Sequence, residues 1–385
     1  ILYGKIYDMN WLERYYEKDF LEKLPPGKVL LIYGARRTGK TSLVANSLKK
    51  FSGKFFSGVG EDADLSLIFS KQTVAGLKSA FSGYDLLFFD EAQRLPNVGI
   101  VLKILADHFP STKIIASGSS SFELSSQVGE PLTGRHTKLL LYPISVLELK
   151  EQFGGMYVIQ NLENLLIYGS YPECLKMENI QDKREYLFSL RNSYLFKDIL
   201  EMENLKNADK LSDLLRLLAF QIGKEVSLSE LGSMIGISKQ TVEKYLDLLE
   251  KSFVIKKVRG FSRNLRNEIT KTCRYYFLDN GIRNSIISNF NSLENRDDIG
   301  MLWENFLFTE RMKKLEYTKA FSNIYFWRTH DKKEIDLVEE RDGNLYGFEF
   351  KWKNQKQKVP KLWLDTYSNA SLEFITKENF LEFIG

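Results

Sequence analysis

The chain has 385 residues, of which 43% are hydrophobic and 27% charged, and its formal net charge is +4. Such a length and composition are typical of a globular protein with two or three domains, and they exclude a long disordered or low-complexity chain. A pI of about 8.7 permits a nucleic-acid partner without arguing for one, because a local patch of charge matters more than the total.

The two cysteines, Cys174 and Cys273, lie far apart and have no partner cysteines near them in the sequence. They predict neither a zinc site nor a disulfide framework, and they favour a reducing cytoplasm. No apolar run approaches membrane-spanning length, and no cleavable signal pattern is present. We therefore expect a cytoplasmic protein that has no membrane partner.

The first predicted domain, residues 1–144, opens with a lead-in helix over residues 1–24 and continues as alternating strands and helices. This alternation predicts an α/β domain with a parallel sheet. Val29–Tyr33 is a short apolar run of the kind that forms a buried strand, and residues 42–49 have the apolar spacing of a helix. Between them, residues 34–41 spell a phosphate-binding loop, and the flanking strand and helix argue against a chance glycine turn.

In such a loop the backbone N–H groups wrap a triphosphate, and the N-terminus of the helix adds its positive dipole end. Lys40 is expected to reach the β- and γ-phosphates, and the Thr41 hydroxyl is expected to ligate Mg²⁺. The sequence thus predicts ATP and Mg²⁺ as cofactors, bound by the loop residues Gly34, Ala35, Arg36, Arg37, Thr38, Gly39, Lys40 and Thr41.

A second motif follows the loop, where residues 84–91 predict a hydrophobic strand that ends in the two carboxylates Asp90 and Glu91. In P-loop enzymes an acid at the end of such a strand holds Mg²⁺, and an adjacent Glu can activate the attacking water as a general base. We therefore predict Asp90 as the metal-side acid and Glu91 as the base for ATP hydrolysis. The alternative, that both acids simply cap the next helix, is weaker downstream of a complete phosphate loop.

Two further features of this domain are candidates for the nucleotide site. Lys113–Ser117 predicts another strand, and the polar cluster 118–121 follows it, so Ser117 and Ser119 are candidate sensors of the γ-phosphate or helix N-caps. Arg135 lies on a loop at the edge of the domain, where it is either a solvated charge or an arginine finger that acts in cis or from a neighbouring subunit. If Arg135 acts from a neighbouring subunit, the protein is a homo-oligomer, so a homo-oligomer is a candidate assembly.

Residues 145–210 predict a helical lid over the nucleotide domain, and residues 211–260 predict a winged helix-turn-helix. In the second segment a short helix ends near Gly236, a second helix opens at Ser238, and a β-like run follows at residues 254–258. The same geometry also serves as a protein-packing module, so DNA and a protein are both candidate partners. The side chains that the second helix would present to a DNA groove are Ser238, Lys239, Gln240 and Lys244.

Near the C-terminus, residues 333–340 and 345–352 predict the two strands of a hairpin. Glu349 and Lys351 share one face of the second strand, and Asp336 on the first strand can meet them there. An Asp followed by Glu-x-Lys on the next strand is the arrangement of metal-dependent nucleases, in which carboxylates hold Mg²⁺ and the Lys orients or activates water.

Glu304, which lies on a predicted helix upstream of this hairpin, could supply another metal ligand. The predicted metal ligands in this region are therefore Glu304, Asp336 and Glu349, with Lys351 as the catalytic lysine. The alternative is a charged, solvent-facing side of a hairpin, which is a common feature that the spacing alone does not exclude.

The chain as a whole resembles prokaryotic, often archaeal, AAA-type ATPases of the STAND-related group that carry a C-terminal restriction-endonuclease-like domain. The resemblance implies an ATP-binding domain, a winged helix and a PD-(D/E)xK-like fold, without establishing cleavage, because members of that nuclease-like fold can be structural. One departure is Thr272-Cys273-Arg274, where a Pro-Lys pair is expected before the strand. The resemblance covers nearly the whole length and rests on residues 34–41, 90–93, 118–120, 134–135, 142–145, 276–281, 303–305 and 327–328, the helix-turn-helix near Ser238, and the set Asp336, Glu349 and Lys351.

The predicted protein is thus an α/β chain with a P-loop AAA-type ATPase domain (1–144), a helical lid (145–210), a winged helix-turn-helix (211–260) and a restriction-endonuclease-like α/β domain (261–385). Our leading hypothesis is an ATPase that couples its nucleotide state to a DNA-binding or nuclease-like tail. A nucleotide switch or scaffold that cuts nothing is one alternative, and an ATP-controlled transcription regulator is another.

Overall fold

The computed structural model describes residues 11–18, 20–119, 132–193, 208–262, 273–329, 333–353 and 361–385. The chain divides into two units. The loop unit consists of residues 13–143 and 251–253, and the tail unit consists of residues 144–250 and 254–385 with the start of the chain through Leu12. Each unit contains its own β-sheet.

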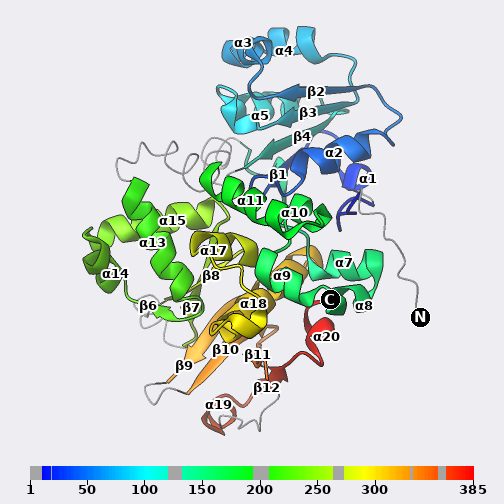
Figure 1. Cartoon of the computed structure of the whole chain (residues 1–385). Helices are drawn as coiled ribbons and strands as arrows, with labels where there is room; N and C mark the ends of the chain where they lie inside the picture. The colour runs from blue at the N-terminus through cyan, green and yellow to red at the C-terminus, as the bar shows by residue number, and fades with distance from the viewer. Residues whose placement is uncertain are drawn as a thin grey trace. The chain divides into compact units, whose positions relative to one another are not determined.

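The sheet of the loop unit has parallel strands in the order β2-β3-β4-β1-β5 (Figure 1). Tyr33 at the end of β1 pairs with Gly118 of β4 and Leu140 of β5, so the carboxyl ends of these strands lie together. The α/β fold with a parallel sheet that the sequence predicts for this part of the chain is confirmed. Its strands are β1 (Val29–Tyr33), β2 (Phe55–Val59), β3 (Leu86–Asp90), β4 (Lys113–Gly118) and β5 (His136–Leu140).

The helix predicted over residues 42–49 begins two residues earlier, at Lys40, because Gly39 caps it in a left-handed conformation with φ 93°. The predicted lead-in helix lies partly outside the described residues, and within them it is reduced to the four residues of α1. The helices of the loop unit are α1 (Phe20–Lys23), α2 (Lys40–Leu48), α3 (Ala63–Lys71), α4 (Val74–Phe81), η1 (Ala92–Arg94) and α5 (Val98–His108).

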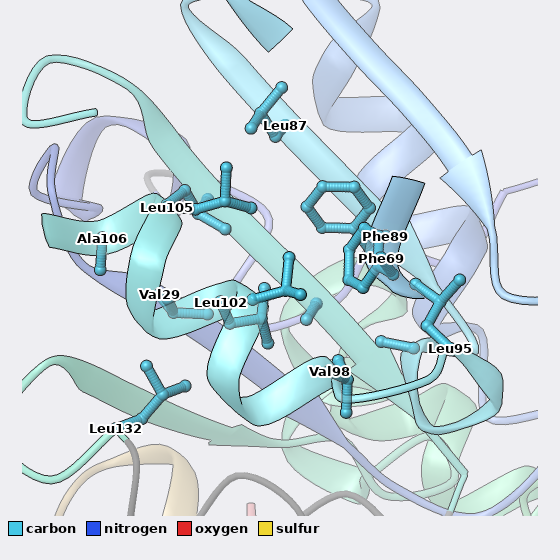
Figure 2. Close-up of a cluster of buried hydrophobic side chains, with 14 of the residues drawn as sticks. Val29, Phe69, Leu87, Phe89, Leu95, Val98, Leu102, Leu105, Ala106 and Leu132 are labelled. Carbon is cyan, nitrogen blue, oxygen red and sulfur yellow. The ribbon is translucent and has the colours of Figure 1, made fainter. Parts of the chain in front are cut away.

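The strands of the loop unit send alternate side chains to two apolar clusters, one on each face of the sheet. β1 contributes Val29 and Leu31 to the cluster that α5 covers, which Figure 2 shows. The intervening Ile32 joins a second cluster together with Leu43 of α2. Burial on both faces explains why these strands are continuous apolar runs in the sequence, and truncating a fully buried aromatic such as Phe89 to Ala would destabilise the unit by about 3–5 kcal/mol.

The tail unit is rich in helices, and no helix among its described residues or those of the loop unit has both the length and the apolar character that crossing a bilayer requires. The segment predicted as a lid is helical where it is described, although its residues 194–207 lie outside the described part. Helices α9 and α11 of this segment pack on α17, which belongs to the same unit. The helices are α7 (Val146–Phe153), α8 (Gly155–Gln160), α9 (Leu162–Tyr168), α10 (Pro172–Lys176), α11 (Ile180–Leu190), α13 (Ala208–Phe220), α14 (Leu228–Ile235), α15 (Lys239–Lys251), α17 (Asn280–Ile286), η3 (Leu293–Asn295), α18 (Ile299–Tyr317), α19 (Lys361–Thr366) and α20 (Phe380–Ile384).

One mixed sheet runs through the tail unit in the order β12-β11-β10-β9-β7-β8-β6 (Figure 1). The predicted hairpin is β10 and β11, which pair antiparallel across the turn at Arg341–Asn344. Strands β7 and β9 pair in parallel, so the boundary predicted between residues 260 and 261 lies inside a continuous sheet. The strands are β6 (Glu225–Val226), β7 (Ile255–Gly260), β8 (Cys273–Phe277), β9 (Asn323–Arg328), β10 (Glu334–Arg341), β11 (Asn344–Phe350) and β12 (Ala370–Ile375).

Candidate functional site

The phosphate loop predicted from the sequence joins the end of β1 to the start of α2. Gly34 has φ +153°, and a Cβ atom at this position would lie 2.1 Å from the carbonyl oxygen of Leu141, so no larger residue fits. Gly39 has φ +93° at the N-cap of α2. The two glycines let the backbone curl in front of the helix N-terminus, where N–H groups without intrahelical partners favour an anion.

The Lys40 side chain folds back over this loop. Its Nζ donates hydrogen bonds to the carbonyl oxygens of Gly34 at 2.8 Å and Ala35 at 2.9 Å, and the residue is 5% exposed. Burial lowers the pKa of Lys40 to about 8, although the carboxylates of Glu91 and Asp90 act in the opposite direction. A polyphosphate would stabilise a buried ammonium that is held by neutral carbonyls, because it forms charge-assisted hydrogen bonds with the ammonium.

Asp90 at the end of β3 is the centre of a polar cluster beside the loop. Thr41 Oγ1 donates to Asp90 Oδ2 at 2.6 Å, and Ser117 Oγ donates to Asp90 Oδ1. The backbone N–H of Glu91 also donates to Oδ1, at 3.1 Å. The sequence-predicted residues Thr41, Asp90 and Ser117 are therefore in contact. Ser117 is hydrogen-bonded to the Asp90 carboxylate and does not occupy a separate sensor position.

Glu91 is held by two side chains from different segments. Gln93 Nε2 donates to Glu91 Oε2 at 2.6 Å, and Ser119 Oγ donates to the same oxygen at 3.3 Å. Gln93 Nε2 also lies 3.2 Å from Ser119 Oγ, while the Gln93 Oε1 atom is buried without a hydrogen-bond partner in the described part of the chain. Sequence reasoning assigned no role to Gln93, although a polar residue two positions after Glu91 is a usable signal.

Arg14 is a second residue of the loop unit that sequence reasoning missed. Its guanidinium donates to the carbonyl oxygens of Thr38 at 2.5 Å and Tyr142 at 2.7 Å, and the residue is 4% exposed. It thereby ties the phosphate loop to the segment after β5. Nothing in the local sequence pattern marks the isolated Arg14 as a residue that anchors the loop. The two arginines that were predicted as loop members are less buried than Arg14, since Arg36 is half-buried and Arg37 is exposed.

Arg135 lies at the opposite end of the sheet from the phosphate loop of its own chain. The residue precedes β5, which runs parallel to β1 with His136 beside Val29 and Leu140 beside Tyr33. The length of the strand separates it from the loop by roughly 16 Å at about 3.3 Å per residue. Its Nε donates instead to Asp107 Oδ1 at 2.6 Å, so an arginine finger acting in cis is wrong on geometric grounds.

The tail unit brings together the second set of sequence-predicted residues. Glu304 comes from α18, Asp336 from β10 and Glu349 from β11, and Lys351 directly follows β11. Asp336 lies beside Glu349 and accepts a hydrogen bond from the Phe350 backbone N–H at 2.9 Å. Lys351 Nζ donates to Glu349 Oε2 at 3.1 Å.

A cation that the sequence analysis did not include lies among these carboxylates. Arg274 of β8 is 3% exposed, and its Nη1 atom lies 3.6 Å from Glu304 Oε1 and 3.7 Å from Asp336 Oδ1. Its Nη2 atom donates to Glu334 Oε2 at 2.7 Å. The Tyr276 hydroxyl donates to Glu304 Oε1 at 2.7 Å.

Burial and mutual repulsion perturb this cluster electrostatically. Burial, followed by the charge of Asp336, raises the pKa of Glu304 to about 8, although Arg274 opposes the shift. Burial and Asp336 likewise raise the pKa of Glu349 to about 8. Burial opposes a rise in the pKa of Lys351, but the carboxylates of Glu349 and Asp336 outweigh it and the pKa is raised.

The donor chemistry of the cluster suits a hard divalent cation, because oxygen ligands predominate. Among the residues that the structure describes, however, no group of three or more His, Cys, Asp or Glu side chains is placed to hold a metal ion. The three predicted ligands are neighbours without being arranged around a common point.

Three family models match successive parts of the chain. Residues 26–150 match an AAA domain, residues 159–293 match a domain of unknown function (DUF8612), and residues 299–376 match another (DUF4143). The first match covers the sheet and phosphate loop of the loop unit.

Relatives of similar sequence occur in bacteria and archaea. The chain is 25% identical to the uncharacterized protein Rv2008c of Mycobacterium tuberculosis, an alignment that covers 84% of this chain and 70% of the relative. It is also 25% identical to the uncharacterized protein MJ1544 of Methanocaldococcus jannaschii, with coverage of 95% and 89%.

Among solved structures, a Walker-type ATPase of Pyrococcus abyssi is similar to the chain with a TM-score of 0.50 and 17% identity, over 74% of this chain and 99% of that one. Identity this low shows a shared fold. The AAA-domain match, the parallel sheet and the loop between β1 and α2 together identify residues 26–150 as a P-loop domain of the AAA ATPase type.

Proposed function

We propose that the loop unit binds ATP together with Mg²⁺ and hydrolyses the bond between the β- and γ-phosphates. The observation that carries this proposal is the 2.6 Å contact between Thr41 Oγ1 and Asp90 Oδ2 beside the buried Lys40. Hydroxyl and carboxylate oxygens are ligands that Mg²⁺ prefers, and this pair is where the ion would be held. When bound, Mg²⁺ neutralises charge on the triphosphate.

The remaining residues of the cluster have distinct roles in this proposal. Lys40 and the loop N–H groups hold the phosphates, and Glu91 accepts a proton from the water whose oxygen attacks the γ-phosphorus. The bond from that phosphorus to the bridging oxygen breaks as the new P–O bond forms, and ADP leaves. Gln93 and Ser119 both bond to Glu91 Oε2, so we assign Oε1 as the proton acceptor.

Thr41→Val tests this function, because valine retains the size of threonine and removes the hydroxyl. We expect Mg²⁺-dependent phosphate release from ATP to be lost while nucleotide binding without Mg²⁺ is retained. Ser42→Ala is the matched control, since Ser42 is the next residue of α2 and is exposed. Turnover in Thr41→Val equal to that of the unmodified protein would contradict the proposed site.

Arg135 can contribute to hydrolysis only in a neighbouring subunit, given its distance from the loop of its own chain. We therefore propose a homo-oligomer in which Arg135 of one subunit faces the nucleotide of the next.

The tail unit supports a second candidate function, a divalent-cation-dependent nuclease-like site. The specific observation is that Asp336 lies close enough to Glu349 for its charge to raise the pKa of that carboxyl, and that Lys351 donates a hydrogen bond to Glu349. Glu304 is nearby, since Arg274 lies within ion-pair distance of both Glu304 and Asp336. Glu304, Asp336 and Glu349 are the acids that would have to converge to hold the cation. A bound cation would supply an activated water, which Lys351 would orient. Cleavage of plasmid and linear DNA with Mg²⁺ or Mn²⁺, with and without ATP, tests this activity. Loss of cleavage in Asp336→Ala would support it, and no cleavage under any condition would favour a nucleotide-dependent switch or scaffold.

The elements α13, β6, α14, α15, β7 and β8 follow the order of a winged helix, with β8 between β6 and β7. On α15, the exposed Lys239, Gln240 and Lys244 that were predicted to meet DNA are interspersed with the exposed Glu243 and Asp247. Carboxylates repel the phosphate backbone, so this helix supports packing against a protein better than it supports DNA reading. A mobility-shift assay in which Lys239→Ala abolishes sequence-specific binding would reverse this ranking.

A further inference from the structure

The peptide group between Thr38 and Gly39 lies in the phosphate loop, immediately before α2. The Gly39 carbonyl accepts the first hydrogen bond of the helix, from the Leu43 N–H at 2.9 Å. The Thr38 carbonyl lies outside the helix, and it accepts a hydrogen bond from Arg14, which is not part of the loop. The Gly39 N–H donates to no group in the described part of the chain, so it is available to a ligand.

The direction of this peptide group decides which way the Gly39 N–H faces. A peptide bond is planar and trans, so the Thr38 carbonyl and the Gly39 N–H point in opposite directions. Gly39 has φ +93°, and a glycine readily adopts other conformations as well, so the loop sequence alone does not fix the direction of the peptide. Arg14 Nη1 holds the Thr38 carbonyl oxygen at 2.5 Å, and it thereby keeps the N–H directed away from the guanidinium.

Arg14 is itself held from several sides, as a residue that orients another group must be. Its Nη2 atom donates to the carbonyl oxygen of Tyr142 at 2.7 Å, and the residue is 4% exposed. Its backbone carbonyl accepts a hydrogen bond from the Glu17 N–H at 2.9 Å, which closes a turn. The Glu17 carboxylate in turn accepts a hydrogen bond from Asn46 of α2. The guanidinium is therefore fixed relative to the segment after β5 and to the helix that follows the loop.

We propose that Arg14 is a positioning residue for nucleotide binding, which holds the Thr38–Gly39 peptide in the direction that presents the Gly39 N–H to the phosphates. This inference rests on the ATP binding proposed above, and it adds a residue that acts on the phosphates through the backbone. Both Nη atoms of Arg14 are bonded to carbonyl oxygens. Loop N–H groups cradle phosphates that ADP and ATP share. Arg14 should therefore affect the binding of both nucleotides equally and leave the chemical step unchanged.

Calorimetric titration of the full chain with ADP and Mg²⁺, together with steady-state ATP turnover, tests this role. We expect Arg14→Met to weaken ADP binding and to raise the KM for ATP by about tenfold or more, with kcat unchanged, because a hydrogen bond to the phosphates loses its orientation. Arg14→Lys keeps the charge and a donor group, so it should show a smaller loss of the same kind, and it serves as the test if Arg14→Met does not fold. Lys113→Met is the matched control, since Lys113 Nζ also donates to a backbone carbonyl, that of Leu21, but Lys113 begins β4 at the end of the sheet opposite the loop.

Equal ADP affinity in Arg14→Met and the unmodified protein would overturn the positioning role and leave the nucleotide site in place. A fall in kcat as large as the rise in KM would assign Arg14 to the fold or to the chemical step, and it would also overturn the positioning role. So would a loss of ADP affinity of the same size in Lys113→Met, because it would show a general destabilisation of the loop unit. Failure of the unmodified protein to bind either nucleotide would overturn both the positioning role and the proposed function.

Discussion

The two clusters use similar groups in opposite ways. In the loop unit, the cation Lys40 is bonded to backbone carbonyls, and the acid Asp90 is bonded to hydroxyl groups. In the tail unit, the cation Arg274 lies directly among the acids. A charge satisfied by neutral groups remains available to a charged ligand, whereas a charge satisfied by its opposite does not. The group that pairs with each charge, rather than the residue types present, therefore distinguishes a site that can bind a charged ligand from one whose charges are already paired with each other.

Lys40→Ala should have the largest effect of these substitutions, on ATP affinity. A small effect would contradict the contrast drawn between the two clusters. We expect ATP affinity to fall at least about 100-fold, because hydrogen bonds from a charged donor each contribute about 1.5–3 kcal/mol and the ammonium is expected to contact two phosphates. Titration with a fluorescent ATP analogue measures the effect. Lys49→Ala removes the same charge from an exposed position at the end of α2 and should leave affinity unchanged. Equal affinities in the two variants would remove the phosphate role of Lys40.

Glu91→Gln should separate binding from chemistry within the loop unit. We expect ATP to bind as in the unmodified protein while the turnover number falls by about 10²–10⁴, the usual contribution of a general base. Single-turnover phosphate release gives the chemical step directly. An unchanged rate would assign the base to another group.

Gln93→Leu tests whether the hydrogen bond from Gln93 orients Glu91 for catalysis. We expect a roughly tenfold lower turnover number with an unchanged KM for ATP, because the substitution removes the 2.6 Å hydrogen bond that orients the base and touches no phosphate-binding group. The same substitution added to Glu91→Gln should have little further effect, as expected of residues that act through one another. Additive losses would indicate an independent role for Gln93.

The raised pKa of Glu304 in the tail cluster should appear as a pH dependence of stability. The pKa of Glu304 is raised to about 8 in the folded chain from 4.5, so the folded state binds more protons between these values and loses stability as pH rises through this window. We expect the melting temperature of the tail unit to fall from pH 5 to pH 8, and to fall less in Glu304→Gln, which mimics the protonated acid and can still accept the Tyr276 hydrogen bond. Parallel curves for the two proteins would contradict the assignment.

Arg135→Ala should have the smallest effect on a single chain. Its exposed ion pair with Asp107 contributes less than about 1 kcal/mol, so Arg135→Ala and Asp107→Ala should unfold at nearly the same denaturant concentration as the unmodified protein. In the turnover assay, specific activity should rise with protein concentration in the unmodified protein and stay flat in Arg135→Ala. A loss of activity that is equal at every concentration would restore a role in cis.

The sequence by itself determined the features whose parts are contiguous along the chain. Residues 34–41 with their flanking strand and helix, and the acid pair that ends β3, could be predicted because strand, turn and helix signals act over a few residues. The hairpin β10–β11 followed for the same reason, since its two strands alternate around a short turn.

Only the tertiary structure decided which distant groups face each other. The contact of Gln93 and Ser119 on Glu91, the place of Arg135 at the far end of β5, and the insertion of Arg274 among the acids depend on strand order and register. Register between strands far apart in the chain is set by packing of whole elements, so no local pattern encodes it. The same reason explains why β7 and β9 join one sheet across a position where composition suggested a boundary.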